Sequence, residues 1–189
     1  MTDGPARLFR LLDAAAIALC ILYALLGVAG LAASGAPYTI IALSAALGGM
    51  LLVLSVIDLR TYRLPDALTL PLAAAGPPLA WANGWGEPLW HIISAIAGYL
   101  LLYGVAQLYA KLRGRAGLGL GDAKLLAAAG SWLGLEGLPT VLLWATSSAL
   151  LAVLAAALLR HPITASTRIP FGPFLALGFW LVWLFGPLA

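Results

Sequence analysis

Residues 50–71 read MLLVLSVIDLRTYRLPDALTLP, and they hold the end of one apolar segment and the start of the next. Asp58 closes the first segment, Arg60 and Arg63 lie in the short connection, and Asp66 opens the second segment. Long apolar segments and short charged connections alternate in this way along the 189 residues, of which 63% are hydrophobic and 9% charged. With a mean hydropathy of +1.02, the chain cannot build a water-soluble surface, so we predict an integral membrane protein.

Seven apolar segments indicate membrane-spanning helices, and continuous runs of Leu and Ala favour a helical bundle over a membrane β-barrel, whose strands would alternate. The segments cover residues 12–33, 38–57, 66–82, 89–110, 122–135, 138–159 and 171–187. The first has about the 20 residues of a spanning helix and exceeds the roughly 7–15 of a signal-peptide core, so we expect it to be retained. We predict an all-α polytopic protein with an N-terminal span in residues 1–37 and a six-span core in residues 38–189, which together form one membrane domain.

The basic residues predict the topology, because cytoplasmic connections of membrane proteins are rich in Lys and Arg. All ten fall before the first span or in and around every second connection: Arg7, Arg10, Arg60, Arg63, Lys111, Arg113, Arg115, Lys124, Arg160 and Arg168. The other connections, 34–37, 83–88 and 135–139, contain Glu87 and Glu136 but no Lys or Arg. We therefore expect a multi-pass protein of the cytoplasmic (inner) membrane with a cytoplasmic N-terminus and an external C-terminus. The net charge of +3 then reports topology, and no nucleic-acid partner is expected.

Three acidic residues lie near span ends on the predicted cytoplasmic side. Asp66 begins a segment after Pro65, where a carboxylate can cap free backbone N–H groups, and Asp122 could do the same after the glycine-rich turn GLGLGD. Asp58 lies at the C-terminal end of its segment, where a carboxylate opposes the helix dipole, although Arg60 could form a surface pair with it. Acids within spans are costly and therefore indicate function.

Two such acids held together have a known chemistry. In an apolar pocket two carboxylates share one proton, and the pair can activate a water molecule while it polarises a peptide carbonyl. Two acids of this group, brought together, would therefore predict aspartic proteolysis, in which the acid and base roles belong to the pair. The alternative is a small transporter, or a pilus or secretion assembly protein, that uses the same aspartates to bind a cation or relay protons.

Other catalytic patterns are missing from the sequence. It has no HExxH zinc motif and no GxSxG nucleophile elbow, and His91 and His161 fall on opposite sides of the predicted membrane. The lone Cys20 excludes an internal disulfide and a cysteine-based metal cluster. We expect no metal and no cofactor.

Three blocks of the sequence resemble type IV prepilin peptidases, a family of GxGD intramembrane aspartic proteases. IDLRTYRLPDALTLP at 57–71 is similar to the first family signature, and GLGLGDAKLLAAAGSWLG at 117–134 is similar to the GxGDxK signature. RIPFGPFLALG at 168–178 resembles a third recurring block. Asp122 follows Asp58 by 64 residues, a separation typical of the family.

The resemblance implies roles for individual residues. Asp58 and Asp122 match the catalytic pair, whereas Asp66 matches a variable Asp/Asn position and keeps its interpretation as a helix cap. Gly119 and Gly121 are implied to bind substrate, since a residue without a Cβ lets an extended substrate backbone approach closely. Lys124 matches the motif lysine and is a further candidate for substrate binding, while snorkelling to the membrane interface explains it equally well.

The family implies an activity as well. Its members remove the short basic leader from prepilins and pseudopilins of type IV pili and type II secretion, at the cytoplasmic face of the membrane. Longer members carry paired CxxC motifs associated with N-methylation, whereas here an extra span contains only Cys20. We therefore expect no methyltransferase activity and no S-adenosylmethionine site. The expected partners are prepilin-like substrates and the lipid bilayer, and a weaker alternative is a protein that binds prepilins without cutting them.

Overall fold

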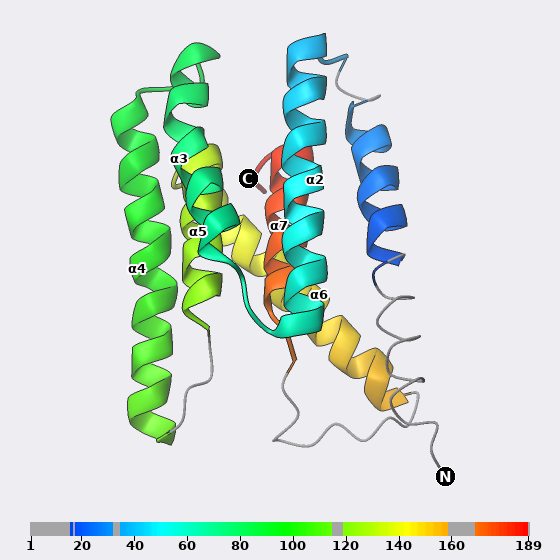
Figure 1. Cartoon of the computed structure of the whole chain (residues 1–189), viewed down its shortest axis with the longest axis vertical. Coiled ribbons are helices and arrows are strands. Elements are labelled where there is room, and N and C mark those ends of the chain that lie inside the picture. The colour runs from blue at the N-terminus through cyan, green and yellow to red at the C-terminus, as the bar shows by residue number, and fades with distance from the viewer. Residues whose placement is uncertain (1–15, 17, 32–34, 115–118, 159–168, 189) are drawn as a thin grey trace.

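The computed structural model describes residues 16, 18–31, 35–114, 119–158 and 169–188, and these form a bundle of helices (Figure 1). The helices are an N-terminal helix over Ala18–Leu31, α2 over Tyr38–Thr61, α3 over Asp66–Ala82, α4 over Pro88–Arg113, α5 over Leu120–Leu133, α6 over Gly137–Leu158 and α7 over Gly172–Phe185. The described residues include no β-strand. The predicted all-α membrane bundle is confirmed, although residues 12–15, 17, 32–33 and 159 of the predicted spans lie outside the described part.

Helix length divides the bundle into long and short members. Helices α2, α4 and α6 are long and apolar enough to cross a membrane. Helices α5 and α7 have 14 residues each, which is a length of about 21 Å against a hydrocarbon core of about 30 Å. In Figure 1 the lower ends of α5 and α7 lie near the lower end of α2 and well above the lower end of α4. The short helices therefore begin at the level where α2 ends.

Helix α5 occupies the centre of the bundle, where it packs against α3, α4, α6 and α7. Glycines let its backbone approach its neighbours closely, as is common between membrane helices. A Cβ on Gly130 of α5 would overlap the Ser94 carbonyl of α4, and a Cβ on Gly98 of α4 would lie 2.7 Å from the Leu126 carbonyl oxygen of α5. Gly76 of α3 meets the α5 backbone in the same manner. Helices α3, α4 and α5 thus form one tightly packed group.

The remaining helices gather around α7, which packs against α2 and α6. The N-terminal helix joins them through Tyr23, which is buried and stacks on Trp180 of α7 with ring centroids 5.9 Å apart. The Trp180 indole N–H also donates to the Tyr23 carbonyl at 3.3 Å. Contacts of α5 with α6 and α7 connect this group to the first one. The division into residues 1–37 and 38–189 stays a prediction.

The connection between α2 and α3 is short and sharply turned. Helix α2 ends at Thr61, and its C-cap is Tyr62, which has a left-handed backbone (φ 54°) and whose N–H bonds to the Asp58 carbonyl at 2.8 Å. A positive φ is uncommon for a residue with a bulky side chain. Pro65 then adopts an extended conformation and precedes the first turn of α3. This turn holds residues 62–65 beside the end of α2.

Replacement of Gly130 by Ala tests the close packing of α5. We expect the added methyl group to clash with the Ser94 carbonyl and to lower the free energy of unfolding by about 1–3 kcal/mol. Gly104→Ala in α4 is the matched control, because a Cβ at that position meets no atom within 4 Å. Thermal unfolding in detergent provides the measurement, and equal midpoints for the two variants would contradict the packing described here.

Candidate active site

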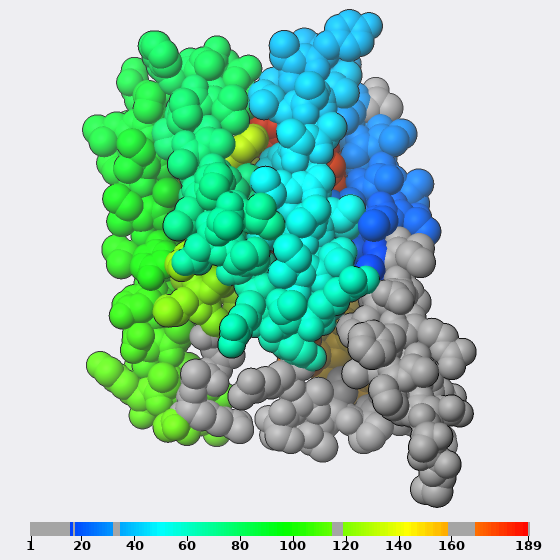
Figure 2. All heavy atoms as spheres, in the orientation of Figure 1, coloured from blue at the N-terminus to red at the C-terminus, as the bar shows by residue number. Residues whose placement is uncertain are grey.

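A cleft with a volume of about 280 Å³ opens where the end of α2, its connection to α3 and the start of α5 meet. Figure 2 shows atoms from the start of α5 (yellow-green) beside those of the α2–α3 connection (teal). The lining residues are Asp58, Tyr62, Arg63, Leu64, Gly119, Leu120, Gly121 and Asp122. Two sequence segments that lie far apart in the chain therefore build one site.

Asp58 reaches this cleft from the last turn of α2. Its side chain is buried, with 5% of the residue exposed. The backbone N–H of Gly172, the first residue of α7, donates to Asp58 Oδ2 at 3.0 Å. A helix N-terminus carries a partial positive charge, so α7 stabilises a carboxylate that opposes the dipole of its own helix.

Asp122 enters the cleft from the first turn of α5 and is 8% exposed. The N-cap of α5 is Gly119, and no side-chain hydrogen bond caps this helix. The structure therefore gives Asp122 no capping hydrogen bond, and its carboxylate lines the cleft with Asp58.

The two carboxylates line the same cleft. Both are shielded from water, and two ionised carboxylates at close range repel each other strongly in such surroundings. One shared proton relieves this repulsion and leaves one acid and one base in the same cleft. This arrangement can activate a water molecule against a polarised carbonyl group.

The two glycines predicted to contact substrate have different surroundings. Both line the cleft. A Cβ on Gly121 would lie 2.9 Å from the Leu64 Cβ, so Gly121 is needed for the start of α5 to pack on the α2–α3 connection. A Cβ on Gly119 would meet its nearest atom, Asp122 Oδ2, at 3.5 Å, an ordinary contact distance. Gly119 is therefore the more open of the two.

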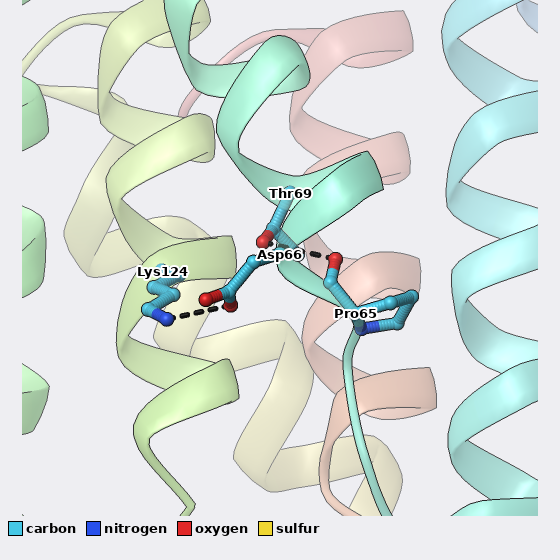
Figure 3. Close-up of polar contacts among 4 residues, drawn as sticks. All are labelled: Pro65, Asp66, Thr69 and Lys124. Carbon is cyan, nitrogen blue, oxygen red and sulfur yellow. Dashed lines mark hydrogen bonds and ion pairs between the residues drawn. The ribbon is translucent and has the colours of Figure 1, made fainter.

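Lys124 does not line the cleft but pairs with Asp66, as Figure 3 shows. Its Nζ lies 2.5 Å from Asp66 Oδ1, which ties the first turns of α5 and α3 together. Pro65 is the N-cap of α3, and no side-chain hydrogen bond caps this helix. Asp66 thus serves as an ion-pair partner rather than as a cap, and substrate binding by Lys124 stays a prediction.

The contact between Gly172 and Asp58 could not be predicted from the sequence. Its donor is a backbone N–H, which carries no residue-type signature. The available signal was the third block at 168–178, to which the sequence assigned no chemistry. The structure brings one residue of that block onto the first aspartate.

The described residues contain no cluster of three or more His, Cys, Asp or Glu side chains that could hold a metal ion. His91 is buried, and its Nδ1 lies 2.9 Å from the Ser131 carbonyl oxygen near the end of α5. His161 lies outside the described residues.

Comparison with known proteins identifies similar chains. A family model described as the type IV leader peptidase family matches residues 45–158. A prepilin leader peptidase/N-methyltransferase of Burkholderia pseudomallei (strain K96243) is 46% identical over 148 residues, which cover 77% of this chain and 45% of the relative. Proteins of the same name from Aeromonas salmonicida and Xanthomonas campestris pv. campestris are 41% and 42% identical over 72% of this chain and 47% of their own length.

The chain therefore spans about half the length of the curated relatives it matches. No solved structure gives a significant match.

Neutralising each partner of the Lys124–Asp66 pair in turn tests how much the pair contributes to the stability of the fold. The Asp66 side chain is 59% exposed, so we expect a coupling energy of about 1 kcal/mol or less. A double-mutant cycle with Asp66→Asn, Lys124→Met and the double variant, followed by thermal unfolding, measures it. A coupling of several kcal/mol would show that this pair holds α3 and α5 together far more strongly than its exposure implies.

Proposed function

The chain belongs to the type IV leader peptidase family, and from this premise we propose that it is a membrane aspartic endopeptidase that removes the short basic leader from prepilin- or pseudopilin-like proteins. The observation that carries the proposal is the pair of buried carboxylates, Asp58 and Asp122, in one cleft. Each lies within a block that resembles a family signature. The pair has the chemical groups that peptide hydrolysis without a cofactor requires.

In the proposed reaction Asp58 and Asp122 share one proton. The ionised carboxylate takes a proton from a water molecule, whose oxygen attacks the scissile carbonyl carbon, while the protonated carboxyl group donates to the carbonyl oxygen. Breakdown of the tetrahedral intermediate then breaks the C–N bond, and a proton passes to the departing amine nitrogen. Which aspartate begins as the base is a property of the pair.

The cleft suits a substrate in an extended conformation. Gly119 offers a backbone without a side chain next to Asp122, and this leaves room for a substrate backbone to approach. We propose that Gly119 and Gly121 contact the segment around the scissile bond. Lys124 is engaged with Asp66, so we assign it a lesser part in substrate binding.

Cation or proton binding by the same aspartates explains the buried pair but offers no reason for the family match. Leader cleavage explains both and is therefore preferred. We propose cleavage alone, because the family model that matches residues 45–158 describes a leader peptidase, whereas methyl transfer appears only in the names of the longer relatives. We further propose that residues 38–189 form the peptidase core, with the N-terminal span attached.

We propose that this chain lies in the bacterial inner membrane with its N-terminus in the cytoplasm and its C-terminus in the periplasm. The basic residues next to the cleft support this orientation. Arg60 and Arg63 flank the end of α2, while Lys111 and Arg113 lie at the lower end of α4, on the same side of the bundle (Figure 1). The positive-inside rule then puts the cleft on the cytoplasmic side, where a basic leader would be located.

Conversion of either cleft aspartate to Asn tests the activity. Co-expression with a prepilin substrate should give leader removal by the wild type and none by Asp58→Asn or Asp122→Asn, because an amide cannot take part in the shared-proton chemistry. Asp66→Asn is the matched control and should retain cleavage, since Asp66 does not line the cleft. Mass spectrometry of the substrate gives the readout. An uncut leader with the wild type, or cleavage by either cleft variant, would reject the proposal.

Cysteine labelling tests the orientation. In a Cys20→Ser background, Glu87→Cys and Glu136→Cys should react with a membrane-impermeant maleimide added to spheroplasts, while Lys111→Cys should react only after permeabilisation. All three positions are exposed in the structure, so accessibility does not limit the reaction. The reverse labelling pattern would put the cleft on the periplasmic side.

A further inference from the structure

We propose that Gly172 is a positioning residue for Asp58, with its backbone N–H orienting the carboxylate and its missing side chain leaving the space that the carboxylate occupies. This inference rests on the function proposed above, because it concerns the same pair of acids. Gly172 is not among the residues that line the cleft, so it acts through Asp58 rather than on the substrate.

The N–H of Gly172 is the available donor at the start of α7. The first N–H groups of a helix have no partner within it. Pro173 has no N–H, and the Phe174 N–H already bonds to the Phe171 carbonyl at 3.1 Å. Gly172 therefore directs its N–H out of the helix and onto Asp58 Oδ2 at 3.0 Å, and both residues are buried.

The missing side chain matters as much as the donor. A Cβ at position 172 would lie 2.6 Å from Asp58 Oδ2 and 3.0 Å from its Cγ. Gly172 has no positive φ, so its backbone does not itself require glycine. The carboxylate is what requires it, because any side chain here would push Asp58 from its place.

This contact has a consequence for the reaction. Because Oδ2 is held by the Gly172 N–H, Oδ1 is the oxygen left to share the proton with Asp122 or to bind the attacking water. Helix α7 packs on both α2 and α6, so the donor is fixed in the bundle rather than carried on a loop. Catalysis depends steeply on such placement, since a displacement of about 1 Å can cost on the order of 100-fold in rate.

Gly172→Ala tests the proposal in the full chain, with a prepilin substrate and purified enzyme in detergent. We expect kcat to fall on the order of 100-fold because the methyl group displaces the carboxylate, while KM stays within about twofold because the substrate surface is untouched. Gly49→Ala is the matched control, since it lies in α2 and a Cβ there meets no atom within 4 Å. It should retain wild-type kcat.

The outcomes separate this proposal from the function on which it rests. Wild-type enzyme that does not cleave the substrate refutes the function, whereas wild-type cleavage with an unchanged kcat for Gly172→Ala refutes the role of Gly172 alone. A lower unfolding midpoint with kcat retained, or a change in KM only, would make Gly172 a packing residue and would also overturn the proposal.

A spectroscopic measurement covers the case in which Gly172→Ala does not fold. Labelling with carbonyl-¹³C phenylalanine and ¹⁵N glycine selects the amides of Phe-Gly pairs, which occur in this sequence at Gly172 and Gly186. In otherwise wild-type protein, Asp58→Ala should move the Gly172 amide signal and leave that of Gly186 in place. A Gly172 signal that ignores the loss of the carboxylate would overturn the proposed contact.

Discussion

Two carboxylates buried among apolar helices constrain the structure around them, because an uncompensated charge removed from water costs several kcal/mol. The N-terminal ends of two helices offset part of this cost. The start of α7 provides an N–H group for Asp58, and Asp122 lies in the first turn of α5, at the positive end of that helix. Both helices have 14 residues and begin beside the end of α2. The shortness of α5 and α7 is thus part of the site, since longer helices would carry their N-termini past the acids.

Apolar runs and the residues that interrupt them predict most helix positions. Hydropathy shows which residues can contact lipid, but it does not show where a helix begins or ends. Residues 66–82 were predicted and observed alike, whereas α2 continues through a polar turn to Thr61, four residues beyond the predicted end. Its backbone hydrogen bonds persist until Tyr62 turns left-handed. The sequence also could not rank helices by burial, because lipid tails are as apolar as Leu. Small residues such as Gly130, rather than hydrophobicity, distinguish the central α5.

The sequence likewise predicts some features of the candidate site and not others. Asp58 and Asp122 stand out in the sequence because acids are rare in spans and need a reason. Their neighbours depend on how helices are rotated against one another, which no single segment encodes. The pairing of Lys124 with Asp66 follows from the register of α5 on α3, and the contact of Gly172 with Asp58 follows from the docking of α7 on α2. Only the folded structure reveals that Lys124 of the second block is paired with Asp66.

The contact between Gly172 and Asp58 joins residues that are 114 positions apart in the chain. At about 5–20 residues per second, a ribosome needs roughly 6–23 seconds to travel from one to the other. During synthesis Asp58 therefore reaches the membrane well before its donor exists. The order of the helices along the chain thus sets a delay between the insertion of Asp58 and the arrival of the Gly172 N–H group. A partly synthesised chain can therefore contain both aspartates before α7 completes the site.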